Sequence, residues 1–469
     1  MKSSSLENLP LDVLWGIVNA TSLHPDLFLA CKTLRAARKR CARKARADHN
    51  AGITNLSQLS GLSSLQTLAF NHSFPGSYCI TDLSPLSGLS SLQTLECRYR
   101  LAISDLSPLS SLFSLQALDF RGCLRITRLS PLSDLSSLQT LSCSNCNGIT
   151  DMSPLSGLSS LQTLNCSQCN GITDMSPLSG LSSLQNLNCR HSNGITNLSP
   201  LSGLSYLQTF DCSFCNGITD LSPLSGLSSL QNLNCSTDYN GITNLSPLSG
   251  LSYLQTFTCT GCNGIKDLSP LSRLFSLHTV NFCQCDGITD LLPLSSLTSL
   301  TDLDCCSCRG LTDLTPLSGL SSLQNVDCRS CYDITDLTPL SSLSSLVYLN
   351  CNGCDGITDL SALSGLSRFQ ILCCNDCHGI TDLSPLSSCT SLQTLLCGWC
   401  NDITNLSPLS GLSCLQKLFI SHCNGIADLS PLSGLSSLQT LDCFACRGIT
   451  DLSPLSGLSS LTINSTTGP

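Results

Sequence analysis

Cysteine is the residue with the most evident capacity for chemistry in this chain of 469 residues, because 34 positions carry it. Ten pairs have the spacing C-x-x-C, for example Cys143 with Cys146 and Cys305 with Cys308. A thiolate is both a nucleophile and a metal ligand, so an isolated pair of this kind would indicate redox chemistry or zinc binding. These pairs recur at a constant period, however, and the period changes their interpretation.

A unit of 23 residues repeats along the chain, with the consensus L-x-x-L-x-x-L-x-C-x-x-C-x-G-I-T-D-L-S-P-L-S-G. Prolines mark its phase every 23 residues from Pro85 to Pro223 and again from Pro247 to Pro454, with Ala362 in the one proline slot that is filled differently. The period predicts about 18 copies between residues 51 and 469. A repeat of roughly 20 to 29 residues with regularly spaced leucines is typical of a solenoid that grows by stacking copies.

Each repeat predicts one strand and one tight turn. Leu164 and Cys166 alternate with polar residues, as expected of a short strand with one buried face. Met175, Leu178 and Leu181 then follow at a spacing of three, which suits a 3₁₀ path. The predicted fold class is therefore an α/β repeat solenoid, with a parallel β-sheet on the concave face and short 3₁₀ or turn segments on the convex face.

Within this framework the paired cysteines are predicted to pack in the core. Phe120, Phe282 and Ile420 replace the first cysteine in some copies, and Ser192 replaces a second one, which a structural metal site would not tolerate. We therefore expect no metal and no cofactor. Strands about 4.8 Å apart are close enough for a disulfide, but parallel side chains give a poor torsion, so no disulfides are expected either.

Charge is divided between the two ends of the chain. Residues 1–50 hold nine Lys and Arg against four Asp and Glu, whereas the remainder holds 13 against 27. An acidic array argues against nucleic acid as the main partner. No apolar run is long enough for a membrane span, and the N-terminus shows no secretory signal, so we expect a location in the cytoplasm or the nucleus and no membrane partner.

The repeats resemble two known types of leucine-rich repeat. The segment I-T-D-L-S-P-L is similar to the repeats of bacterial internalins, and C-x-x-C-x-G-I-T-D is similar to the cysteine-containing repeats of F-box proteins. The resemblance implies a leucine-rich-repeat solenoid over residues 51–469. It also places Cys169 where many such repeats carry an asparagine whose side chain bonds to neighbouring backbone.

The first fifty residues predict a small helical module. Apolar residues recur at helical spacing after Pro10, and a second helix is expected from Pro25 to Arg46. Together with the later segment C-K-x-L-R, this pattern resembles an F-box, which docks on a Skp-type adaptor of a cullin ubiquitin ligase. The resemblance implies that the adaptor is contacted by Leu9, Pro10, Val13, Leu14 and Ile17. The alternative is a helical cap that only shields the first repeat.

Differences between copies indicate where a partner binds. The residue before the inward cysteine is polar in most copies, but Leu396 and Phe419 are apolar, and Trp399 and Phe444 lie in nearby slots. Clustered apolar residues on the concave face suggest a binding surface. We therefore expect Leu396, Trp399, Phe419 and Phe444 to receive an unknown protein partner. Drift among relaxed repeats is the alternative.

No catalytic arrangement emerges from the sequence, because the seven histidines are scattered and the serines belong to the repeat framework. The chain is therefore interpreted as a non-enzymatic recognition protein. By resemblance, its most specific predicted function is the substrate receptor of a cullin-type ubiquitin ligase. A stand-alone leucine-rich-repeat scaffold, or an adhesion protein similar to internalins, is the alternative.

Overall fold

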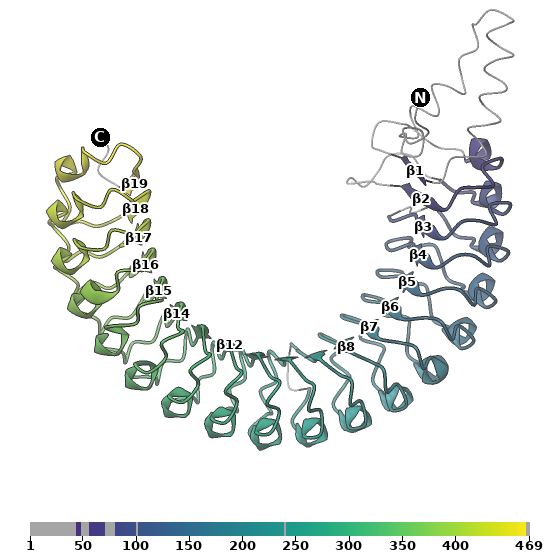
Figure 1. The fold of residues 1–469 in the computed structure, drawn as a ribbon, viewed down its shortest axis with the longest axis horizontal. Coiled ribbons are helices and arrows are strands. Elements are labelled where there is room, and N and C mark those ends of the chain that lie inside the picture. The colour runs from purple at the N-terminus through teal and green to yellow at the C-terminus, as the bar shows by residue number, and fades with distance from the viewer. Residues whose placement is uncertain (1–43, 48–55, 71–79, 100–101, 239–240, 466–469) are drawn as a thin grey trace, which may run out of the picture. The chain divides into compact units, whose positions relative to one another are not determined.

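The computed structural model describes residues 44–47, 56–70, 80–99, 102–238 and 241–465, in two compact units that span Met1–Leu230 and Gln231–Pro469. Within each unit, short parallel strands stack side by side, and single 3₁₀ turns stack behind them (Figure 1). One strand and one 3₁₀ helix make one repeat of 23 residues. The predicted solenoid of strands and 3₁₀ turns is thus confirmed within each unit.

The first unit contains eight strands and eight 3₁₀ helices. The strands are β1 (Lys44–Ala47), β2 (Thr67–Phe70), β3 (Thr94–Glu96), β4 (Ala117–Asp119), β5 (Thr140–Ser142), β6 (Thr163–Asn165), β7 (Asn186–Asn188) and β8 (Thr209–Asp211). The helices are η2 (Ser57–Leu59), η3 (Ser84–Leu86), η4 (Ser107–Leu109), η5 (Ser130–Leu132), η6 (Ser153–Leu155), η7 (Ser176–Gly180), η8 (Ser199–Leu201) and η9 (Ser222–Leu224). These counts apply to the described residues.

The second unit continues the same alternation. Its strands are β9 (Asn232–Asn234), β10 (Thr256–Thr258), β11 (Thr279–Asn281), β12 (Asp302–Asp304), β13 (Asn325–Asp327), β14 (Tyr348–Asn350), β15 (Ile371–Cys373), β16 (Thr394–Leu396), β17 (Lys417–Phe419), β18 (Thr440–Cys443) and β19 (Thr462–Ser465). Its helices are η10 (Ser246–Leu248), η11 (Ser269–Leu271), η12 (Leu292–Leu294), η13 (Thr315–Leu317), η14 (Thr338–Leu340), η15 (Ser361–Leu363), η16 (Ser384–Ser388), η17 (Ser407–Leu409), η18 (Ser430–Leu432) and η19 (Ser453–Leu455).

The strand register follows the repeat. Leu164 of β6 pairs with Leu187 of β7, 23 residues further along the chain. Leu233 of β9 pairs with Phe257 of β10, so the extra residue in this copy lies between the two strands and leaves the ladder in phase. The second residue of each strand from β2 to β18 is buried, whereas the first and third residues are in most strands only partly buried. We call the surface formed by these first and third residues, with the exposed residues that directly follow each strand, the strand face.

The segment T-D-L-S-P-L has a local structural explanation. The carboxylate of Asp151 accepts the backbone N–H of Ser153 at 2.8 Å, and this bond orients the chain at the start of η6. Pro154 fits in the first turn of the helix because that position needs no N–H donor. Asn197 accepts the N–H of Ser199 in the same way, at 2.9 Å. The aspartates of the repeat are therefore framework residues.

A second recurrent feature follows the strands. Among the described residues, twelve other than glycine have a positive φ, each in the second position after the inward residue: Tyr99, Asn145, Gln168, His191, Phe214, Gln284, Ser307, Ser330, Asp376, Trp399, His422 and Ala445. In most of these repeats the same residue donates its N–H to the next repeat, as Asn145 does to the carbonyl of Ser167 at 2.7 Å. The left-handed turn thus extends the ladder of hydrogen bonds beyond the strands.

One prediction for the N-terminal region is wrong. Lys44–Ala47 is a strand that pairs in parallel with Thr67–Phe70, whereas residues 25–46 were expected to form a helix. The edge of β2 presents unpaired backbone groups, and an added strand satisfies them where a helix would not.

Residues 1–43 lie outside the described part of the chain, and so does the rest of the predicted helical module. Each helix of the described residues is a short 3₁₀ turn, none with the length and hydrophobicity that crossing a bilayer requires.

Candidate functional site on the strand face

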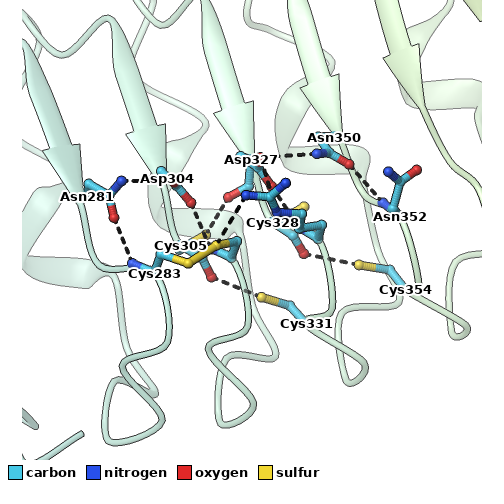
Figure 2. A network of polar contacts seen from close by, with 12 residues as sticks. Asn281, Cys283, Asp304, Cys305, Asp327, Cys328, Cys331, Asn350, Asn352 and Cys354 are labelled. Atoms are coloured by element: carbon cyan, nitrogen blue, oxygen red, sulfur yellow. Dashed lines mark hydrogen bonds and ion pairs between the residues drawn. A yellow bond between two sulfur atoms is a disulfide. The ribbon is translucent and has the colours of Figure 1, made fainter. Parts of the chain in front are cut away.

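The second cysteine of each C-x-x-C pair forms a ladder of thiol hydrogen bonds. The Cys331 thiol donates to the carbonyl of Cys305 at 3.1 Å, and the Cys354 thiol donates to the carbonyl of Cys328 at 3.2 Å (Figure 2). Ser192 makes the equivalent bond through its hydroxyl, to the carbonyl of Cys166 at 3.0 Å. The thiols therefore take the bonding role expected of asparagine at this position.

Burial keeps some of these thiols protonated. Cys146, Cys400 and Cys423 are fully buried, and burial raises the pKa of each thiol to about 12. A thiol with such a pKa is protonated at neutral pH and is neither a nucleophile nor a ready ligand. Packing in the core is thus confirmed for the paired cysteines that the structure describes.

The expectation that no disulfide forms is wrong for one pair. Cys283 and Cys306 are bonded to each other, with their Cα atoms 4.5 Å apart. The expectation concerned the cysteines that point into the core, and neither Cys283 nor Cys306 is one of them. Each follows an inward residue, Phe282 or Cys305, and lies just beyond its strand. Here the backbone of adjacent repeats turns, so the side chains escape the parallel alignment of the strands.

Beside the disulfide, polar side chains of four strands form a network on the strand face (Figure 2). Asn281 of β11 donates to Asp304 of β12 at 2.8 Å, and Asn350 of β14 donates to Asp327 of β13 at 3.0 Å. Arg329 forms an ion pair with Asp327 at 3.7 Å. Burial, together with the neighbouring charge of Asp327, raises the pKa of the Asp304 carboxyl above its usual value.

The third strand residue also has a structural role that sequence reasoning missed. Asp304 accepts the backbone N–H of Cys306 at 3.0 Å, and Asp442 accepts that of Phe444 at 3.0 Å, so each closes a turn two residues later. Asn and Asp at this position therefore stabilise the turn that follows the strand. The sequence signal was the recurrence of Asn or Asp at this place in more than half of the copies.

In two repeats the third strand residue is apolar and cannot accept the backbone N–H two residues later. An asparagine of the preceding repeat accepts this N–H instead. The amide oxygen of Asn352 accepts the N–H of Asn375, and that of Asn375 accepts the N–H of Gly398, both at 2.7 Å. Each asparagine thus serves the next repeat along, where Cys373 or Leu396 offers no oxygen. The apolar residues are compensated by neighbours and are not isolated defects.

The structure brings the predicted partner-binding residues together. Leu396 of β16 pairs in register with Phe419 of β17, and both side chains are partly exposed on the strand face. Trp399 and Phe444 are 47% and 45% exposed. His422 links them: its ring stacks on Trp399 at 3.7 Å between centroids and meets Phe444 edge-on at 5.9 Å. We call Leu396, Trp399, Phe419, His422 and Phe444 the apolar patch.

The structure adds His422 to the predicted partner-binding residues. Its ring lies between Trp399 and Phe444 because the three repeats stack on one another. The predicted adaptor-binding residues Leu9, Pro10, Val13, Leu14 and Ile17 all lie outside the described residues. The ligase-receptor prediction is therefore neither supported nor contradicted by the geometry.

Comparisons with known proteins agree with the repeat assignment. A family model described as "Leucine Rich repeats (2 copies)" matches residues 114–157, 136–180, 159–203, 182–226, 228–273, 390–434 and 415–457. A search of curated proteins gave no match.

Among solved structures, the functional domain of InlJ from Listeria monocytogenes is 25% identical, with a TM-score of 0.57 over 80% of this chain and 73% of that one. That domain is described as including a cysteine ladder. A leucine-rich-repeat protein of Leptospira interrogans is 17% identical, with a TM-score of 0.62 over 88% of this chain and 99% of that one. An internalin from Listeria monocytogenes is 27% identical over 73% of this chain and 84% of that one, with a TM-score of 0.46.

Proposed function

We propose that this leucine-rich-repeat protein, whose cysteine-containing repeats are similar to those of internalins, is a non-catalytic scaffold that binds a protein partner. The partner is received by the apolar patch on repeats β16 to β18. Solenoids of this kind present an extended surface on which side chains vary while the framework is kept. The described chemistry agrees with this function, because the paired cysteines are buried in the core and polar residues of β11 to β14 are hydrogen-bonded to one another.

The conformation of Trp399 is the observation that carries the proposal. Its φ of 64° lies in the left-handed region, where a bulky side chain is disfavoured. Other repeats place Asn, Gln, Ser or Gly at this position, and a few place an aromatic residue such as Tyr99, His191 or Phe214. Because the position accepts side chains as different as glycine, serine and phenylalanine, the fold does not require a tryptophan here. Trp399 is nevertheless 47% exposed and stacked on His422. A large, half-exposed aromatic at a strained position is typical of an interface anchor.

The patch fits a partner that inserts an aliphatic or aromatic side chain. Leu396 and Phe419 provide a floor on the strands, and the stacked rings of Trp399, His422 and Phe444 provide a wall beside it. Lys417 of β17 is exposed at the first strand position, so a carboxylate near the inserted side chain would find a counter-charge. In a typical interface, a small number of such anchor residues carries most of the binding free energy.

The proposal is tested by replacing Trp399 and Phe419 with Ser and measuring partner recovery by quantitative affinity purification from the native host. The matched control is Phe275→Ser, because Phe275 is 58% exposed but lies between η11 and β11, away from the strand face. Proteins that are lost with the patch variant and retained with the control variant are the expected result. An interactome that responds equally to both variants would reject the apolar patch as the site.

The more specific function, a substrate receptor of a cullin ubiquitin ligase, remains a prediction that rests on residues 1–50. Neither the family match nor the similar structures include an F-box, so the stand-alone scaffold has the better support. Co-purification of a Skp-type adaptor with the full chain, and its loss from a chain that begins at residue 51, would decide for the ligase. Recovery of no adaptor with either chain would leave the scaffold as the function.

A further inference from the structure

One group of side chains outside the apolar patch has the composition of a metal site. The two sulfurs of Cys283 and Cys306 and a carboxylate oxygen of Asp304 all lie within 4.8 Å of one another, at the ends of β11 and β12. No function assigned above uses these three residues. In the structure the sulfurs are joined as a disulfide, and reduction would convert them into two thiols.

Reagents can reach this pair, unlike the ladder thiols. Cys283 is partly exposed, whereas Cys306 is 1% exposed and has the Nη2 of Arg329 at 3.9 Å from its sulfur. A reducing thiolate can therefore attack the Cys283 sulfur, and the Cys306 sulfur leaves as a thiolate beside a guanidinium. A second thiolate from the reductant then attacks the mixed disulfide and frees Cys283. The reductant supplies two electrons and leaves as its own disulfide.

We propose that the reduced pair, together with Asp304, binds a thiophilic divalent cation, with Zn²⁺ as the best match. Zinc accepts cysteine sulfur and carboxylate oxygen, and three protein ligands with one water complete a tetrahedral site. Harder cations such as Mg²⁺ prefer all-oxygen sites, so the two sulfurs select against them. On binding, the two thiols release their protons to solvent and both sulfurs become ligands.

Asp304 is already held in position for this role. One of its oxygens accepts the N–H of Cys306 at 3.0 Å, and the other accepts the side-chain amide of Asn281 at 2.8 Å. Each carboxylate oxygen has two lone pairs, so coordination leaves both hydrogen bonds in place. Partners of this kind orient a ligand before the metal arrives. Because the disulfide and the metal use the same two sulfurs, the two states exclude each other.

Cobalt titration of the full-length protein without a tag tests the proposal, since thiolate bonds to Co²⁺ give a charge-transfer absorption. The protein is reduced with a phosphine, freed of reductant and titrated with CoCl₂, and then challenged with ZnCl₂. The same protein left oxidised is a control that needs no mutation. Cys283→Ser removes one sulfur and Asp304→Asn removes the charged ligand. Cys414→Ser is the matched control, because Cys414 is the exposed free cysteine among the described residues.

We expect the reduced chain to show a thiolate–cobalt absorption that Zn²⁺ displaces. The absorption should be absent from the oxidised chain and from Cys283→Ser, weakened in affinity by about tenfold or more in Asp304→Asn, and unchanged in Cys414→Ser. An absorption that persists in Cys283→Ser would place the metal elsewhere and overturn the proposal. So would a reduced chain that binds no cobalt through sulfur.

Discussion

The side-chain oxygen of Asn375 accepts the backbone N–H of Gly398 at 2.7 Å, one repeat further along the chain. In most repeats the acceptor for this N–H comes from the same repeat, two residues earlier, but Leu396 occupies that place here. An unmatched buried N–H would be unfavourable, and the neighbouring asparagine prevents it. The hydrogen bond thus allows an apolar residue on the strand face without loss of the turn.

Replacement of Asn375 by Ala should lower the free energy of unfolding by about 1 kcal/mol, because the Gly398 N–H loses its acceptor. Leu396→Asp in the same background should recover most of this loss, since it places a carboxylate two residues before Gly398 as Asp442 does before Phe444. The midpoints of urea unfolding measure both effects. A double variant no more stable than Asn375→Ala would contradict the exchange of acceptors.

Replacement of Trp399 by Asn should change stability little, although it removes a large side chain. Relief of the left-handed backbone conformation is worth about 1–2 kcal/mol, and loss of the stack on His422 costs about 0.5–1.5 kcal/mol. The two nearly cancel, so we expect a net change within about 1 kcal/mol together with loss of the partner. By contrast, Phe257→Ala, at a fully buried ring, should cost about 3–5 kcal/mol. Thermal unfolding of the three proteins provides the comparison, and destabilisation by Trp399→Asn comparable to that by Phe257→Ala would show that the tryptophan is structural.

The thiol ladder should stabilise the protein through its hydrogen bonds more than through the packing of the sulfur atoms. Cys331→Ala removes the donor to the Cys305 carbonyl and should destabilise the protein by about 1 kcal/mol or more. Cys331→Ser keeps a donor at the same place, as Ser192 does, and should be milder. Urea midpoints of both variants test the order. If Ser is the more damaging replacement, the thiol contributes mainly as an apolar group.

The aspartates of the T-D-L-S-P-L segment predict loss of stability in acid. Hydrogen bonds from the side chain and backbone of the residue two positions later lower the pKa of these carboxyls below the unperturbed value of 3.8, in Asp82, Asp105, Asp151, Asp174, Asp220, Asp267, Asp313, Asp359, Asp382, Asp428 and Asp451. A lowered folded pKa stabilises the protein fully above the unfolded value, and this stabilisation is lost as pH falls through the folded value. Unfolding should therefore begin below about pH 4.

Asparagine provides the control for this effect, because Asn197, Asn244 and Asn405 already make the same bond without a charge. Changing Asp220, Asp267 and Asp313 to Asn should leave stability at pH 7 nearly unchanged. Below pH 4 the variant should lose less stability than the natural chain. Thermal midpoints measured from pH 7 to pH 2.5 would reveal the difference, and identical acid profiles would mean that other groups control acid unfolding.

Much of the fold was predictable because a period reports burial directly. The leucines and the inward cysteines recur every 23 residues, so their place in the core followed from spacing alone. The grouping of Leu396, Phe419 and Trp399 was predictable for the same reason, since equal positions in successive repeats must stack. The helix expected to end at Arg46 failed because residues at the edge of a sheet respond to the unpaired strand beside them, which local spacing does not show.

By itself, then, the amino-acid sequence determined the repeat, the buried positions and the existence of an apolar patch, because each of these depends on which residues occupy equal places in successive copies. Only the tertiary structure decided which side chains bond across repeats. The bridge from Cys283 to Cys306, the stack of Trp399 on His422 and the bond from Gly398 to Asn375 all depend on distances of a few ångströms after the chain has turned. Such contacts arise from backbone direction at the ends of strands, which a linear pattern does not record.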